Sequence, residues 1–163
     1  MSDQPQIQPD GTSGVRVFPP AIFLGGLVIG YLIQWLIPIP IVPAGWNIII
    51  RIVGAIVLAL GFWVMLSAAR IFRRIGTPPN PRMETTGLAV DGPYRFTRNP
   101  MYLGMTLILA GLALLGNALW PLIAVIPSVW FIHTRVIARE EPYLEAKFGD
   151  EYRAFRERVR RWL

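Results

Sequence analysis

Residues 47–71 read NIIIRIVGAIVLALGFWVMLSAARI, and this stretch decides the fold. Its charged residues are Arg51, about one turn after the start, and Arg70, next to the end. An apolar run of about 20 residues has the length that a helix needs to cross a bilayer. The long side chain of Arg51 can reach the membrane interface from inside such a helix. We therefore predict a transmembrane helix over residues 47–71.

The composition of the whole chain agrees with a membrane protein. Of its 163 residues, 53% are hydrophobic and 16% are charged, whereas a typical soluble domain has about 25% charged residues. A soluble protein of this length could not bury so much apolar surface. Further apolar stretches predict spans over residues 21–37, 100–119 and 121–138. We expect an all-α integral membrane fold with about four transmembrane helices and a C-terminal amphipathic helix.

Polar segments lie before, between and after these spans. Residues 1–19 are rich in Gln, Pro, Ser and Gly, which predicts a disordered tail. Residues 73–98 are dense in Pro and Gly, which excludes a long helix. Apolar residues recur every three or four positions over residues 140–162 and predict an amphipathic helix, lying on the membrane surface or against the loop. Residues 20–163 are expected to form a single domain.

Basic residues are distributed unevenly around the predicted spans. The connections 38–46 and 116–121 contain no Lys or Arg, whereas residues 70–98 contain six Arg and residues 135–163 contain eight Lys or Arg. Because basic residues concentrate in cytoplasmic loops, we expect residues 73–98 to form a cytoplasmic loop and both termini to be cytoplasmic. Basic residues beside apolar spans fit anionic lipid headgroups, so we expect the bilayer as a partner and not nucleic acid.

The chain has no cysteine and one histidine, His133. These counts exclude a disulfide framework and a thiolate nucleophile, and we expect no metal site. His133 lies inside the last predicted span, where we expect its polar side chain to form a hydrogen bond within the bundle.

A polar segment leads into the third predicted span and reads GPYRFTRNPMYLG over residues 92–104. Asn99 followed by Pro100 is typical of a helix start, with Asn at the N-cap and Pro in the first turn. The free N–H groups of a first helical turn, with Arg98 beside them, form a site suited to a carboxylate or a phosphate. Tyr94 and Tyr102 add aromatic rings and hydroxyl groups. The segment is therefore a candidate ligand site.

Two acidic residues, Glu140 and Glu141, lie where the last span ends, on the same side of the membrane as this segment. A pair of carboxylates can hold an ammonium group, a sulfonium group or the diol of a ribose. Together with an anion site and aromatic rings, these groups match those of S-adenosylmethionine, as they would match many other ligands.

The sequence resembles the isoprenylcysteine carboxyl methyltransferases and the related phospholipid N-methyltransferases, in particular their short bacterial members. The resemblance rests on four motifs: Gly92-Pro93-Tyr94, RNPMYLG over residues 98–104, Glu140-Glu141, and FGDEY over residues 148–152. It covers residues 80–163, about half of the chain. It implies a membrane-embedded methyltransferase that uses S-adenosylmethionine and no metal.

The resemblance also implies roles for individual residues. The residues implied to bind the cofactor are Thr86, Gly87, Leu88, Ala89, Tyr94, Asn99, Pro100, Met101, Tyr102 and Glu140. Arg135 is implied to face the substrate, with Arg139 as the second candidate, and Glu141 is the nearby candidate base for a protonated amine. The best-known members have His where this chain has Asn99, which can form hydrogen bonds but cannot act as a base.

We expect methyl transfer from S-adenosylmethionine to a membrane-associated small or lipidic acceptor, and we favour an isoprenylcysteine-like carboxylate because it needs no general base. Phospholipid or amine N-methylation is the alternative. A non-enzymatic membrane scaffold or accessory protein is an alternative of another class, and it would not bind S-adenosylmethionine. A reductase of the sterol-reductase kind is a third alternative. That class resembles this family in its C-terminal half, but it uses a nicotinamide cofactor and its members are generally much longer. The sequence leaves the acceptor and the oligomeric state open.

Overall fold

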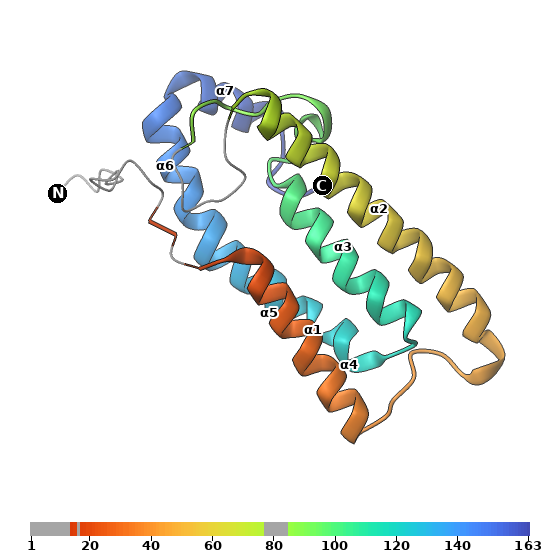
Figure 1. The fold of residues 1–163 in the computed structure, drawn as a ribbon. Helices are drawn as coiled ribbons and strands as arrows, with labels where there is room; N and C mark the ends of the chain where they lie inside the picture. Colours follow the sequence, from red (N-terminus) through yellow and green to blue (C-terminus); the bar gives the residue numbers. More distant parts are fainter. Residues whose placement is uncertain (1–13, 16, 77–84) are drawn as a thin grey trace.

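The computed structural model describes residues 14, 15, 17–76 and 85–163. Its regular elements are helices, and no β-strand occurs among the described residues, which confirms the all-α fold class. Most of the predicted tail (residues 1–19) and residues 77–84 of the predicted loop lie outside the described residues. In chain order the elements are α1 (Pro19–Leu36), η1 (Ala44–Trp46), α2 (Asn47–Arg74), η2 (Gly92–Arg95), α3 (Pro100–Leu115), α4 (Leu119–Ile123), α5 (Val125–Phe131), the π-helix η3 (Ile132–Ile137), α6 (Ala138–Phe148) and α7 (Asp150–Arg158) (Figure 1).

Three helical stretches among the described residues are long and apolar enough to cross a membrane: Pro19–Leu36, Ala44–Arg74 and Leu119–Phe148. The sequence predicts a further span over residues 100–119, where α3 has 16 residues. That is about 24 Å of helix against a hydrocarbon core of about 30 Å. Large apolar side chains of α1 and α2 are exposed, among them Trp35 at 80%, as surfaces that face lipid would be. The chain is an integral membrane protein, and α3 is its shorter apolar helix.

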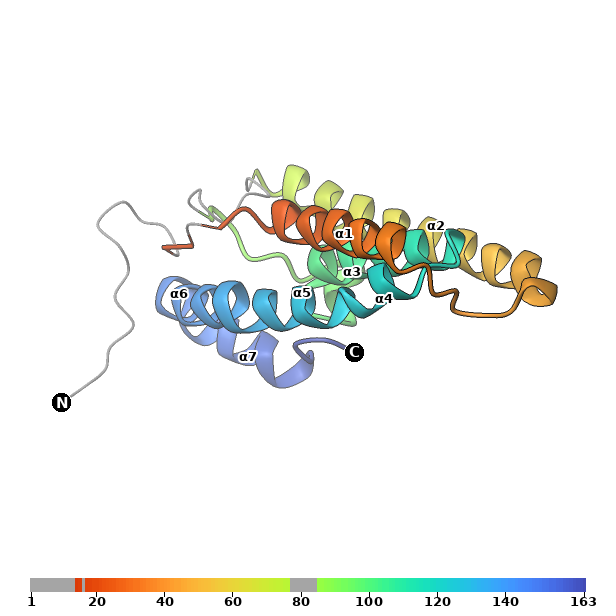
Figure 2. The ribbon, with the colours of Figure 1, turned by 90° about the horizontal axis from the view of Figure 1, so that it is seen from below.

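Glycines bring the backbones of α2 and α3 into direct contact. Gly54 and Gly61 of α2 face Gly111 and Gly104 of α3, and the two glycines of each helix lie about two turns apart. A Cβ atom added at Gly111 would lie 2.6 Å from the backbone nitrogen of Leu58. Because lipid does not drive helices together as water does, small residues that permit close packing stabilise helix pairs in membranes. Figures 1 and 2 accordingly show α3 running beside α2.

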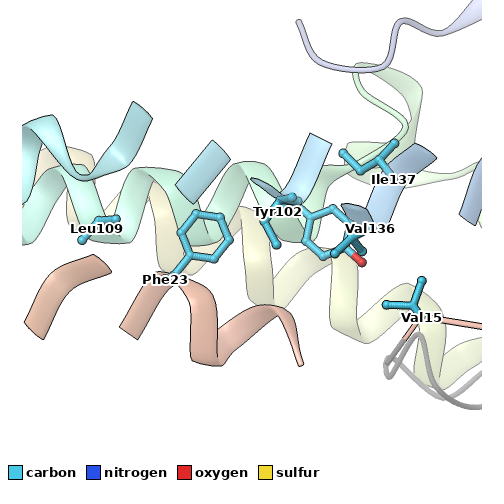
Figure 3. Packing of buried hydrophobic residues seen from close by; sticks show 7 residues of the cluster. Val15, Phe23, Tyr102, Leu109, Val136 and Ile137 are labelled. Carbon is cyan, nitrogen blue, oxygen red and sulfur yellow. The ribbon is translucent and has the colours of Figure 1, made fainter. Parts of the chain in front are cut away.

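A core of apolar side chains joins α1, α3 and η3. Phe23 of α1, Leu109 of α3 and Val136 of η3 are buried in one cluster, and Figure 3 shows them between the helices together with Tyr102. Val15, in the described end of the predicted tail, is buried in the same cluster. The cluster therefore holds the beginning of the first helix against α3 and η3.

The C-terminal segment forms two helices where the apolar stripe predicts one over residues 140–162. The last span continues through η3 into α6. Gly149 follows with a φ of 53°, a left-handed conformation that favours glycine and ends the helix. The chain then turns back, so that Tyr152 and Phe155 of α7 pack in one cluster with Tyr94. The sequence predicts that the apolar stripe lies on the membrane surface or against the loop, and in the structure it packs against the loop.

Asn117 joins the two connections at the opposite end of the bundle (Figure 1). Its side-chain oxygen accepts hydrogen bonds from the N–H groups of Ile41 at 2.9 Å and Val42 at 3.0 Å. Its amide nitrogen donates to the carbonyl of Val42 at 2.9 Å and to Oδ1 of Asn47 at 2.6 Å. The amide therefore satisfies backbone groups that water reaches poorly at the edge of a membrane.

Replacing Asn117 with glycine is expected to lower the free energy of unfolding by about 2 kcal/mol, because partly buried backbone groups lose their partners. Glycine adopts the φ of 46° at this position readily, so backbone strain would not cause the loss. The measurement is unfolding by SDS titration in mixed micelles. Gly45→Ala is the control, because a Cβ there meets nothing within 4 Å. Unchanged stability of Asn117→Gly would contradict this role of the amide.

Candidate functional site

A cavity of about 320 Å³ lies where the first turn of α3 meets α6 and α7. Ligand sites in proteins are clefts of about 300–1,000 Å³. The start of α1, the end of α2 and the segment before η2 complete its walls. The lining residues are Phe18, Pro19, Pro20, Phe72, Thr85, Gly87, Leu88, Ala89, Tyr94, Arg98, Asn99, Pro100, Met101, Tyr102, Met105, Glu140, Glu141, Tyr143, Leu144, Tyr152 and Phe155.

The residues predicted to bind a cofactor come together at this cavity. Nine of the ten line it: Gly87, Leu88, Ala89, Tyr94, Asn99, Pro100, Met101, Tyr102 and Glu140. Thr86 lies outside the lining; its side chain is exposed, and its hydroxyl donates to the carbonyl of Gly76 at 3.0 Å. The neighbouring Thr85 lines the cavity in its place. Two stretches that are distant in the sequence, residues 87–102 and residue 140, therefore contribute to one space.

Arg135, expected to face the substrate, does not line the cavity. Its side chain is exposed on η3, and Arg139, the second candidate, is also exposed. The side chains of η3 that are fully buried are Ile132, Val136 and Ile137. The register of the π-helix therefore gives the inward positions to apolar residues, and the role of Arg135 toward the substrate stays a prediction.

Glu140 contributes a carboxylate to the cavity, and two tyrosines accompany it. The hydroxyl of Tyr102 donates to Oε1 of Glu140 at 2.8 Å. Tyr94 is buried, and its ring packs edge-on against Phe72 with 5.5 Å between the centroids. Burial, and after it the negative charge of Glu140, raise the pKa of Tyr94 well above its ordinary value, so its phenol stays neutral. The cavity thus offers a carboxylate and neutral hydroxyls to a ligand.

Glu141, expected as a base for a protonated amine, is engaged by two guanidinium groups. Nη1 of Arg98 lies 3.0 Å from its Oε1. Nε of Arg161 donates to the same oxygen at 2.9 Å, and Nη2 of Arg161 pairs with Oε2. The side chain of Glu141 is 13% exposed. Both carboxylate oxygens of Glu141 are therefore engaged by guanidinium groups within the protein, and its role as a base stays a prediction.

Asn99 occupies the N-cap position of α3 and Pro100 begins the helix, which confirms the predicted helix start. The side chain of Asn99 makes no capping hydrogen bond, and its Nδ2 donates to the carbonyl of Arg161 at 2.9 Å. Arg98 also turns to the C-terminal part of the chain, where its Nη1 donates to the hydroxyl of Tyr152 at 3.3 Å. The groups expected to form an anion site therefore hold the C-terminal segment.

Sequence reasoning did not identify the C-terminal residues that complete this end of the bundle. The indole Nε1 of Trp162 lies 3.2 Å from Nδ1 of His133, so the histidine of the last span pairs with the C-terminal segment. Tyr152 and Phe155 belong to the apolar stripe read from the sequence, which marks them for burial without indicating the surface that covers them. No periodicity distinguishes Arg161 from the other basic residues of the tail.

The helices and the cavity define an integral membrane protein with a small-molecule-sized site at one end of its bundle. A family model described as "Phospholipid methyltransferase" matches residues 49–151, from the beginning of α2 to the beginning of α7. The chain belongs to this family of membrane methyltransferases. The superfamily resemblance drawn from the sequence motifs is thereby confirmed.

Two curated relatives match shorter parts of the chain. An uncharacterized protein from Haemophilus influenzae is 54% identical over 65 residues, which make up 39% of this chain and 100% of that protein. The Protein-S-isoprenylcysteine O-methyltransferase of Schizosaccharomyces pombe is 36% identical over 73 residues, which make up 44% of this chain and 30% of that protein. The chain therefore covers less than a third of the second relative. No solved structure matches the chain.

Proposed function

We propose that the chain transfers a methyl group from S-adenosylmethionine to a membrane-associated small or lipidic acceptor, preferably an isoprenylcysteine-like carboxylate. The shared cavity is the observation that carries this proposal. The family resemblance implies ten residues as cofactor contacts, and all of them except Thr86 line one space. Methyltransferases of the matched kinds generally use S-adenosylmethionine.

The groups of the cavity are complementary to those of S-adenosylmethionine. The carboxylate of Glu140 can accept hydrogen bonds from amino or ribose hydroxyl groups, and its charge is opposite to that of a sulfonium. Leu88, Ala89 and Met101 supply apolar wall suited to a flat base. Tyr94 and Tyr102 supply hydroxyl groups, which can donate and accept hydrogen bonds. Size, charge and polarity of the cavity therefore fit this molecule.

The mechanism would be direct displacement. When bound, S-adenosylmethionine would supply an electrophilic methyl group: the acceptor oxygen would form a bond to the methyl carbon as the bond from that carbon to sulfur breaks, and neutral S-adenosylhomocysteine would leave. A carboxylate acceptor loses no proton in this reaction. The chain would contribute by aligning the two reactants and by keeping water away from the acceptor oxygen. Met105 and the start of α1 at Phe18 form an apolar part of the wall, suited to the apolar body of the acceptor. An acceptor that needs no base agrees with the paired state of Glu141.

N-methylation of a phospholipid is the second candidate, and the description of the matched family favours it. An ammonium group must lose a proton before it can attack. Glu140 would have to accept that proton, since its carboxylate lines the cavity outside the Arg98 and Arg161 pairs.

We also propose that the cavity end of the bundle and both termini face the cytoplasm. Arg73, Arg74, Arg135 and Arg139 are exposed toward this end. The connection around Asn117 at the other end carries no Lys or Arg. This distribution follows the rule that basic residues remain on the cytoplasmic side.

Protein in phospholipid bilayers, given S-adenosylmethionine labelled in its methyl group, is expected to label a farnesylated cysteine that has a free carboxylate. Alkali cleaves a methyl ester and releases volatile methanol, whereas an N-methyl group is stable to alkali. The amide of the same farnesylated cysteine is the matched control and should remain unlabelled. Alkali-stable label on phosphatidylethanolamine would establish the amine reaction instead. Failure to bind S-adenosylmethionine at all would favour the scaffold.

A further inference from the structure

The last residues of the chain cross over the segment that begins α3 (Figure 1). We call residues 159–162 the C-terminal strap. The N–H of Arg98 donates to the carbonyl of Arg160 at 2.9 Å. The carbonyl of Arg161 accepts hydrogen bonds from Oγ1 of Thr97 at 3.0 Å and from Nδ2 of Asn99 at 2.9 Å. Thr97 is 2% exposed, so the strap seals a buried polar group at the start of α3.

The side chain of Arg161 connects the strap to the other wall of the cavity. Its guanidinium pairs with both oxygens of Glu141, near the beginning of α6. Its Nη1 also lies 3.2 Å from Nε2 of His133, in η3. The hydrogen bond with Glu141, more than any other cause, raises the pKa of Arg161, so the guanidinium stays charged. Arg161 therefore links the start of α3 to α6 and η3.

The strap lies outside the cavity, since none of residues 159–162 is among the lining residues described above. Its partners Arg98, Asn99 and Glu141 do line the cavity, and they come from both walls. Glu141 immediately follows Glu140, so the pairing of one carboxylate constrains the backbone that orients the other. A residue that fixes these partners can set the spacing of the walls without touching a ligand.

We propose that Arg161 is a positioning residue of the S-adenosylmethionine site and that it acts through Glu141. This inference rests on the proposed function. A guanidinium presents two donors in one plane and matches the two oxygens of a carboxylate, which a lysine ammonium cannot do. A charge alone at this position is therefore expected to restore only part of the pairing with Glu141, and the rest depends on the fork geometry of arginine.

The test is calorimetric titration of detergent-purified protein with S-adenosylmethionine, which reports the dissociation constant and the fraction of competent protein separately. Arg161→Gln is expected to raise the dissociation constant about tenfold, the effect of losing one charge-assisted hydrogen-bonded contact. Arg161→Lys is expected to recover part of this loss. Arg160→Gln removes the same charge from the adjacent exposed side chain and should leave binding within about twofold of wild type.

A double variant tests whether Arg161 acts through Glu141. If it does, adding Arg161→Gln to Glu141→Gln should change binding much less than Arg161→Gln changes it in the wild-type background. Equal effects in both backgrounds would overturn that route. A lower competent fraction with an unchanged dissociation constant would show a folding role only and would overturn the inference. Wild-type protein that does not bind S-adenosylmethionine would instead refute the proposed function itself.

Discussion

Replacing Glu140 with glutamine is expected to weaken S-adenosylmethionine binding about 100-fold, because the cavity loses a charge opposite to that of the ligand. Glutamine has nearly the same shape as glutamate, and its amide oxygen can still accept the hydrogen bond from Tyr102. The substitution therefore removes the charge and preserves the packing. Titration calorimetry on detergent-purified protein measures the change.

Glu145→Gln is the matched control for this experiment. Glu145 lies on the same helix, α6, and its carboxylate pairs with Arg156 at 2.7 Å and Arg153 at 3.6 Å outside the cavity. Such partly exposed pairs contribute little, so binding should stay within about twofold of wild type. Tyr94→Phe separates the tyrosine ring from its hydroxyl, and a smaller loss than that of Glu140→Gln is expected. Equal binding by Glu140→Gln and wild type would contradict the assignment of Glu140 to the cofactor.

Replacing Gly111 with alanine is expected to lower the free energy of unfolding by about 3 kcal/mol, because the added methyl group overpacks the contact between α2 and α3. Its Cβ would lie 2.6 Å from the backbone nitrogen and 2.8 Å from the Cα of Leu58. Backbone atoms cannot rotate away as a flexible side chain can, so the helices must separate. SDS titration in mixed micelles measures the loss.

The same substitution at Gly25 provides a control of opposite sign. A Cβ there meets nothing within 4 Å, and alanine is a better helix former than glycine by about 1 kcal/mol. Gly25→Ala should therefore be as stable as wild type or more stable. If Gly111→Ala behaved like Gly25→Ala, close backbone contact would not be what holds α2 to α3.

Local features of the sequence are sufficient to predict much of the fold and of the candidate site. Apolar length predicts the spans, and Asn99 with Pro100 predicts the start of α3, because each depends on neighbouring residues. The motif resemblance pointed to nine of the 21 residues that line the cavity, since motifs record short segments. Arg135 lies within the π-helix η3 and is exposed there, outside the cavity lining. The sequence could not place its side chain relative to the cavity, because apolar periodicity does not reveal a π-helix.

The sequence by itself determined that this chain is a helical membrane protein of the methyltransferase superfamily, and it predicted that the segments around residues 87–102 and 140 form its site. Composition, hydrophobic length and motif spacing carry that information, because they act over one turn or one span. Only the tertiary structure decided how Glu141 is used and where the tail lies. An ion pair such as Arg161 with Glu141 joins residues that are distant along the chain. Which of the many charges pair depends on how close the folded backbone brings them, and no local pattern encodes that distance.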